Sequence, residues 1–139
     1  MSRFVLDCSV TMTWCFENEV DEYGDAVLDA LDGNTALVPA LWPVEVVNVL
    51  VVAERRKRLT RADSMRFLHF LSDLPLVVDD PIPLRHQGML LALARENKLS
   101  GYDAAYLHLA MRERLPLATR DVALRAAAKM ARVPAFEAS

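Results

Sequence analysis

Short apolar runs alternate along this chain with longer segments in which apolar residues recur at helical spacing. The short runs predict strands at residues 3–6, 36–38, 76–78 and 116–119, and a short edge strand at 134–136. The longer segments predict helices at residues 9–16, 21–31, 44–56, 60–71, 83–96, 102–114 and 121–130. This alternation predicts an α/β fold, in which helices cover both faces of a mostly parallel central sheet in three α/β/α layers.

The segment 44–56 is the ambiguous one, because its many valines have strand propensity. Its length, Pro43 near a first helical turn and the charged end that follows favour a buried helix. In that helix Glu45 and Asn48 would share a face, so Asn48 could hold or orient Glu45.

Length and composition indicate one globular domain covering residues 1–139, because 53% of the 139 residues are hydrophobic. No apolar run approaches the ~18 residues of a membrane span. The start of the chain lacks a signal-peptide pattern, and Cys8 and Cys15 match neither a zinc site nor a disulfide framework. We therefore expect a cytoplasmic protein with reduced thiols and no membrane partner.

Four acidic residues, Asp7, Glu45, Asp103 and Asp121, lie at the ends of predicted buried elements. Each aspartate has a local explanation: Asp7 and Asp121 as helix N-caps, and Asp103 as the acid of a capping box with Ser100. Glu45 is the exception, since its apolar setting would desolvate it and demand a cation or a hydrogen-bond donor.

Taken together, the four acids indicate a shared metal site. At a spacing of ~6 Å and an effective dielectric of ~20, each pair of carboxylates costs about 3 kcal/mol. Six such pairs would rival the ~5–15 kcal/mol stability of a domain. A divalent cation reverses the sign of that cost. All-oxygen ligands favour Mg²⁺ or Mn²⁺.

The net charge of −3 argues against a nucleic-acid partner, because contacts to phosphate need a basic surface. If four acids bind metal, however, the remaining surface has 15 acidic and 16 basic residues, so RNA is not excluded. The basic run 55–58 is interpreted as a solvated helix end. The three histidines are scattered and form no metal spacing.

The chain resembles the PIN-domain ribonucleases, specifically the VapC-type toxins of prokaryotic toxin–antitoxin pairs. Four motifs in order over nearly the whole length show the likeness: FVLDCSV at 4–10, WPVEVVN at 42–48, LSGYDAAYL at 99–107 and LATRD at 117–121. Trp14 also sits where many members carry tryptophan. Cys8 departs mildly from the pattern, since alanine or threonine is commoner there.

The resemblance implies a metal-dependent endoribonuclease whose catalytic and metal-binding residues are Asp7, Glu45, Asp103 and Asp121. Ser9, Asn48 and Thr119 would be supporting polar residues. Water attack would leave a 3′-hydroxyl and a 5′-phosphate. The implied partners are an RNA substrate, a VapB-like antitoxin and a second copy of the chain.

Two other classes of function stay open from the residues. One is a catalytically inactive PIN-like binding module, against which the four intact acids argue. The other is a metal-dependent phosphatase of doubly wound fold, which often has a second Asp two residues after its nucleophile, where this chain has Ser9. Cleavage of RNA rather than of a small phosphoester separates these classes.

Overall fold

The computed structural model describes residues 2–138, and a four-stranded parallel sheet forms its centre. The sheet has the order β3-β2-β1-β4, with bounds β1 Arg3–Leu6, β2 Thr35–Val38, β3 Leu76–Val78 and β4 Leu117–Ala118. Val5 of the central strand β1 pairs with Leu37 on one side and with Leu117 on the other. The carboxyl ends of β1 and β4 therefore lie next to each other, and Asp7 N–H donates to the Ala118 carbonyl at 2.9 Å.

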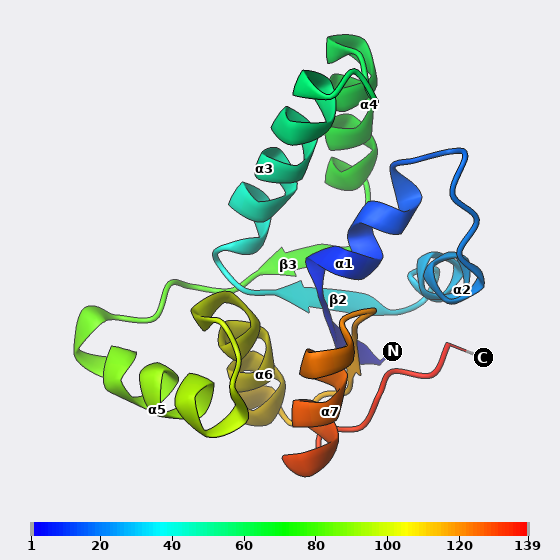
Figure 1. Ribbon diagram of the computed structural model, residues 1–139. Helices are drawn as coiled ribbons and strands as arrows, with labels where there is room; N and C mark the ends of the chain where they lie inside the picture. The colour runs from blue at the N-terminus through cyan, green and yellow to red at the C-terminus, as the bar shows by residue number, and fades with distance from the viewer. Residues whose placement is uncertain (1, 139) are drawn as a thin grey trace.

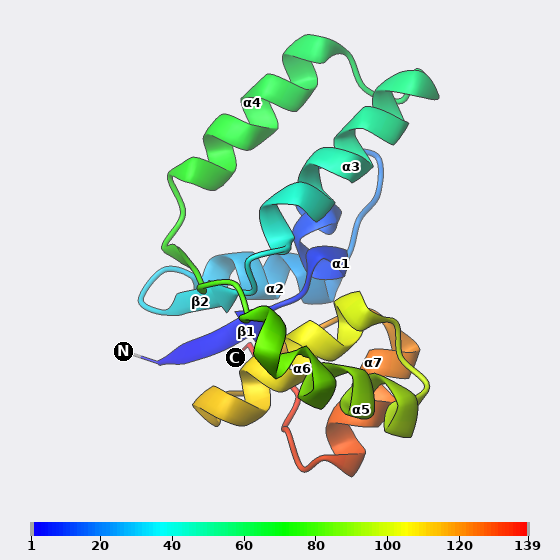
Figure 2. The same ribbon diagram turned by 90° about the vertical axis from the view of Figure 1, so that its left-hand side faces the viewer.

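Helices cover both faces of the sheet, which confirms the predicted α/β/α layering (Figure 1). Their bounds are α1 Cys8–Thr11, α2 Glu22–Ala30, α3 Trp42–Arg55, α4 Arg61–Ser72, α5 Gln87–Asn97, α6 Gly101–Glu113 and α7 Val122–Met130. In both ribbon views α1 and α2 lie on one face, while α6 and α7 lie on the other with α5 outside α6. Helices α3 and α4 form a hairpin that extends away from the sheet (Figure 2).

The ambiguous valine-rich segment is helical, as predicted, and Pro43 lies in the first turn of α3. The predicted capping box is also present, because the Thr60 hydroxyl accepts from Asp63 N–H while the Asp63 carboxylate accepts from Thr60 N–H. Both elements could be read from local sequence because the residues that decide them are close in the chain.

Three predicted elements are wrong in extent. The segment 9–16 forms only α1 and a 3₁₀ turn, η1 (Met12–Trp14), while a second 3₁₀ turn, η2 (Leu84–His86), replaces the start of the helix predicted at 83–96. The predicted fifth strand is reduced to an isolated bridge between Leu117 and Ala135. Only two residues of β4 remain to pair with it, and prolines at 116 and 134 lack the N–H groups that would extend the ladder.

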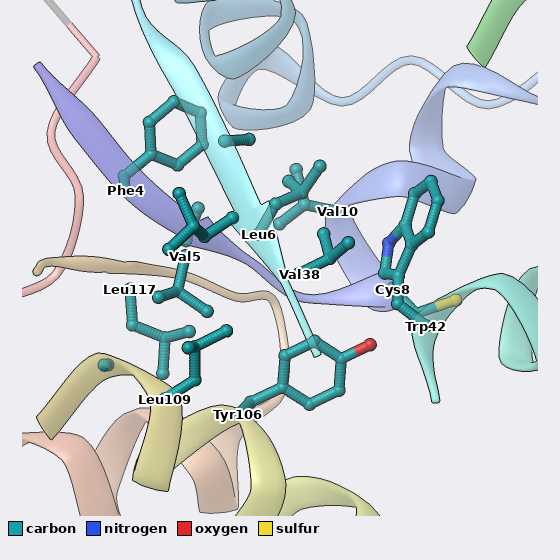
Figure 3. Close-up of a cluster of buried hydrophobic side chains, with 14 of the residues drawn as sticks. Phe4, Val5, Leu6, Cys8, Val10, Val38, Trp42, Tyr106, Leu109 and Leu117 are labelled. Carbon is teal, nitrogen blue, oxygen red and sulfur yellow. The ribbon is translucent and has the colours of Figure 1, made fainter. Parts of the chain in front are cut away.

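The core is built around β1, whose Phe4, Val5 and Leu6 have no exposed surface (Figure 3). Leu109 of α6 and Leu117 of β4 pack with them. Complete burial of a large apolar side chain stabilises the fold by about 1.5–3 kcal/mol. This core holds the carboxyl ends of β1 and β4 and the start of α6 in fixed relative positions.

Candidate active site at the carboxyl end of the sheet

Asp7 follows β1 directly and is 4% exposed. It takes the N-cap position of α1, but its side chain makes no capping hydrogen bond, so the interpretation of its carboxylate as a helix cap is wrong. Instead, its Oδ2 accepts hydrogen bonds from Ser9 Oγ at 2.6 Å and from Thr119 Oγ1 at 2.8 Å. The Asp7 carboxylate is therefore bound by hydroxyls from two separate segments of the chain.

Ser9 and Thr119 also bind the loop after β4 through backbone N–H groups. Ser9 Oγ accepts from Arg120 N–H at 2.9 Å, and Thr119 Oγ1 accepts from Asp121 N–H at 3.0 Å. The two hydroxyl oxygens are 3.4 Å apart. Because each hydroxyl donates to Asp7 and accepts from this loop, the pair fixes Asp7 relative to the loop that bears Asp121. Two of the three predicted supporting residues, Ser9 and Thr119, thus contact Asp7.

Glu45 lies in the first turn of α3 and is half-buried. Its Oε1 accepts a hydrogen bond from the Tyr106 hydroxyl at 2.5 Å. Asn48 is exposed, and within residues 2–138 no hydrogen bond joins it to Glu45. Asn48 therefore does not orient Glu45 in this structure, and Tyr106 takes that place.

Tyr106 is the site residue that sequence reasoning missed. Its ring has no exposed surface, and in Figure 3 its hydroxyl points away from Leu109 and Leu117. Two signals could have found it: Tyr106 lies one helical turn after Asp103, and a buried tyrosine hydroxyl usually has a hydrogen-bond partner. What the sequence did not show is that α3 supplies that partner, 61 residues away.

Asp103 and Asp121 lie at the starts of α6 and α7. The N–H of Asp103 donates to Ser100 Oγ at 3.1 Å, which is one half of the predicted capping box. Asp121 is the N-cap of α7, as the local interpretation predicted, and its Oδ1 accepts from Leu124 N–H at 2.8 Å. The cap uses only one of the two carboxylate oxygens of Asp121, so Asp121 can cap α7 and still bind a metal ion with its other oxygen.

The four carboxylates are electrostatically coupled to one another. Burial raises the pKa of Asp7, and the charge of Asp121 raises it further, against the hydrogen bonds from Ser9 and Thr119. Burial also raises the pKa of Glu45, with additions from Asp7 and Asp103 that the Tyr106 hydrogen bond opposes. The pKa of Asp103 is raised by burial and then by Asp121 and Asp7. The sheet thus gathers four acids whose charges disfavour the ionised forms of Asp7, Glu45 and Asp103.

In the part of the chain that the structure describes, no basic side chain forms an ion pair with this cluster. Among residues 2–138, none of the ion pairs includes Asp7, Glu45, Asp103 or Asp121. Arg120, next to Asp121 in sequence, pairs with Asp21 at 3.0 Å. In the same part of the chain no three acidic, histidine or cysteine side chains lie close enough to hold a metal ion as they stand. Coupled carboxylates without a cation repel one another, which opposes tighter convergence.

The donor chemistry fits a hard divalent cation. Carboxylate oxygens are preferred ligands of Mg²⁺ and Mn²⁺, and a bound cation would favour the ionised forms that burial disfavours. The nearby Cys8 is not a competing ligand, because burial, with Glu45 and Asp7, raises the pKa of its thiol to about 12. Cys8 therefore stays protonated at neutral pH, and the available site ligands are all oxygens.

Comparison with known proteins places this arrangement in a family. A family model described as PIN domain matches residues 4–130, which include all four acids. The chain belongs to the PIN domain family. No match is found among curated proteins. In the described part of this PIN domain, no helix has the length and apolar character to cross a bilayer.

Two solved structures resemble this PIN domain over most of their length. The crystal structure of PAE2754 from Pyrobaculum aerophilum is 25% identical with a TM-score of 0.68, covering 91% of this chain and 87% of that chain. The crystal structure of VapBC2 from Rickettsia felis, bound to a DNA fragment from their promoter, is 14% identical with a TM-score of 0.61. That match covers 96% of this chain and 94% of the other, and at this identity it shows the shared fold alone.

Proposed function

We propose that this PIN domain is a metal-dependent endoribonuclease and the toxin of a type II toxin–antitoxin pair. The observation that supports the nuclease is the group of four coupled carboxylates at the carboxyl end of the sheet, which form no ion pair with any cation of residues 2–138. PIN domains are generally nucleases that use divalent metals. The toxin assignment draws on the motif resemblance and on the shared fold with the VapBC2 structure.

In this proposal Asp7, Glu45, Asp103 and Asp121 are the catalytic residues and hold Mg²⁺ or Mn²⁺. When bound, the ion supplies a Lewis acid that activates water and neutralises charge on the scissile phosphate. Ser9 and Thr119 hold Oδ2 of Asp7, as Tyr106 holds Oε1 of Glu45. A carboxylate has about four acceptor positions, so these hydrogen bonds orient the ligands and leave other lone pairs free.

The direct test removes one carboxylate at a time while keeping its shape. We expect Glu45→Gln to abolish cleavage of a defined RNA in Mn²⁺ buffer while the protein stays folded. Asp32→Asn makes the same chemical change at an exposed acid and should cleave like wild type. Mapping the ends should give a 3′-hydroxyl and a 5′-phosphate. Wild-type cleavage by Glu45→Gln, or hydrolysis of a small phosphoester in place of RNA, contradicts the proposal.

We further propose that an antitoxin binds a groove beside the hairpin. The apolar segment 10–16 is partly covered by the chain itself, because Trp14 donates to the Gly24 carbonyl at 2.8 Å and so packs on α2. The groove that we propose for the antitoxin lies between this segment and the α3–α4 hairpin. It has a volume of about 730 Å³ and is lined by Phe16, Phe67 and Phe70 among others. Aromatic anchors of this kind are enriched at protein interfaces. An antitoxin arginine reaching the four acids would pair them bidentately and compete with metal.

A homodimer is the second proposed assembly. Val44, Val47 and Val51 are exposed at spacings of three and four residues, so they form one apolar stripe along α3. Stripes of this kind mark helix-packing surfaces. Light scattering of the purified protein should give twice the mass of the 15.6 kDa chain, and Val47→Asp should return it to the monomer.

Since the proposed substrate is cellular RNA, we also propose a cytoplasmic location.

A further inference from the structure

The far end of the α3–α4 hairpin concentrates positive charge in an otherwise acidic protein. Residues 54–66 contain six basic and two acidic residues, a net charge of +4, against ten basic and seventeen acidic residues elsewhere, a net charge of −7. Figures 1 and 2 both show the turn of this hairpin at the end remote from the sheet. Two backbone hydrogen bonds, Lys57 N–H to Glu54 O and Arg58 N–H to Ala53 O, close this turn.

Two of the six cations are already paired. Arg58 binds Glu19 at 2.7 Å and lies 4.1 Å above the Phe16 ring, while Arg66 pairs with Asp63. The other four are exposed, and within residues 2–138 none forms an ion pair or a side-chain hydrogen bond. We call these four residues the basic tip: Arg55, Arg56, Lys57 and Arg61.

Helix capping does not account for the basic tip. Arg55 lies in the last turn of α3, where a cation is favourable to the helix dipole. Arg61, however, is the first residue of α4, where the dipole disfavours a cation. The interpretation of residues 55–58 as a solvated helix end therefore accounts for Arg55 but not for Arg61, which lies at the N-terminal end of α4.

The chemistry of the basic tip suits phosphate better than a protein surface. Protein interfaces are built on buried aromatic and aliphatic anchors, with lysine depleted. The one large apolar residue of the turn, Leu59, is half-buried and packs against the core. What the tip exposes is four unpaired cations, which is the requirement for binding the backbone of a nucleic acid.

The basic tip also lies at a useful distance from the acids. Ten residues of α3 separate Glu45 from Arg55, which corresponds to about 15 Å at ~1.5 Å per residue. At ~3.4 Å per stacked nucleotide this is roughly four nucleotides. We propose that the basic tip binds the phosphate backbone of the RNA substrate about four nucleotides from the scissile phosphate. This inference rests on the proposed nuclease function and adds a second contact to it.

The test compares RNA binding by two four-charge variants. One replaces the basic tip: Arg55→Gln, Arg56→Gln, Lys57→Gln and Arg61→Gln. The control replaces four exposed cations on other elements that are unpaired within residues 2–138: Arg85→Gln, Arg95→Gln, Lys98→Gln and Arg114→Gln. Both variants go from net charge −3 to −7, so a general charge effect is the same in each. Fluorescence anisotropy in EDTA measures binding of a 20-nucleotide RNA without metal-dependent cleavage.

Each phosphate contact contributes a slope of about −0.7 in log K against log salt. If two tip cations contact phosphate, the tip variant loses about 1.4 in log K per tenfold change in salt. It should therefore bind this RNA about 25-fold more weakly than the control at 0.1 M salt, taking the two to bind equally at about 1 M. The slope should then be shallower by about 1.4. In Mn²⁺, RNAs with two nucleotides on each side of the cleaved bond should be cut equally by the tip variant and the control.

Three results would overturn the basic tip as an RNA site. The first is equal salt slopes for the two variants, and the second is a loss of cleavage by the tip variant that is as large on the shortest RNAs as on the long ones. The third is loss of antitoxin binding with RNA binding unchanged. The last result would assign the tip to an acidic protein. Failure of the nuclease proposal reads out separately, as absence of cleavage by the wild-type protein in Mn²⁺. Circular dichroism and melting check that the two variants, which change only exposed side chains, are folded alike.

Discussion

Tyr106→Phe is the most informative single change, because it deletes one oxygen and leaves the buried ring in place. The hydroxyl donates to Oε1 of Glu45 at 2.5 Å from a position with no solvent access. A hydrogen bond to a charged group contributes about 1.5–3 kcal/mol. We therefore expect the free energy of unfolding of the metal-free variant to fall by up to about that amount at high pH, where the ionised form of Glu45 is most populated.

The loss of stability should depend on pH with a definite sign. The Tyr106 hydrogen bond lowers the pKa of Glu45 against the larger effect of burial, which raises it. Deleting the hydroxyl thus moves the folded-state pKa of Glu45 still higher. The stability difference between wild type and variant should be largest at the highest pH tested and should shrink as the pH falls and Glu45 becomes protonated. Urea denaturation at several pH values measures this dependence.

Metal binding gives a readout that is separate from stability. Without the Tyr106 hydroxyl, the Glu45 carboxylate is free to rotate and binds a proton more tightly, and both changes weaken Mn²⁺ binding. If together they cost about 1.4 kcal/mol of binding free energy, calorimetry should show an Mn²⁺ affinity about tenfold weaker. Cleavage should recover when Mn²⁺ is raised, since no ligand has been removed.

Tyr23→Phe is the matched control. Its hydroxyl donates to the Phe136 carbonyl at 2.8 Å, so the same atom is deleted from a hydrogen bond to a neutral group. We expect a loss of about 0.5–1.5 kcal/mol with no change in Mn²⁺ affinity. The reasoning about Tyr106 is refuted if both variants lose stability equally at every pH and bind Mn²⁺ equally well.

Three further predictions follow from the same geometry. Asp103→Asn should lower RNA cleavage by at least about 100-fold, since even outer-shell partners of metal ligands contribute 10–100-fold, yet raise the stability of the metal-free protein at pH 7 by removing charge from the coupled acids; a less stable variant contradicts this. Asp7, Glu45 and Asp103 have folded-state pKa values raised above their ordinary values, so the stability they contribute is present at lower pH and lost as the pH rises. Mn²⁺ should therefore raise the melting temperature more at pH 8 than at pH 5, and equal shifts would argue against these acids as ligands. Gly24→Ala should destabilise the fold by about 1–3 kcal/mol, because its Cβ would lie 2.0 Å from Thr13 Oγ1, and Thr13→Ala should recover part of the loss in a double-mutant cycle.

Sequence predicted the elements that depend on neighbouring residues. The four central strands, the helical state of α3 and the Thr60 capping box were each decided by residues within one turn or one run. The four acids also stand out in the sequence, because carboxylates at the ends of apolar segments are unusual; their role as metal ligands stays a prediction. Of the elements predicted with the wrong extent, the fifth strand depends on pairing, because two-residue β4 leaves little edge for it. In the other two, η1 and η2 replace helical turns.

Only the tertiary structure decided which side chains act on the acids. Helical spacing predicted Asn48 as the partner of Glu45, but α6 brings the buried hydroxyl of Tyr106 there from 61 residues away. The Asp7 carboxylate could have capped α1, yet Thr119, 112 residues later, binds it because β4 pairs with β1. The basic tip likewise exists only because α4 folds back beside α3 and adds Arg61. Local sequence determines which residues are chemically unusual, whereas strand pairing and helix packing determine which of them meet.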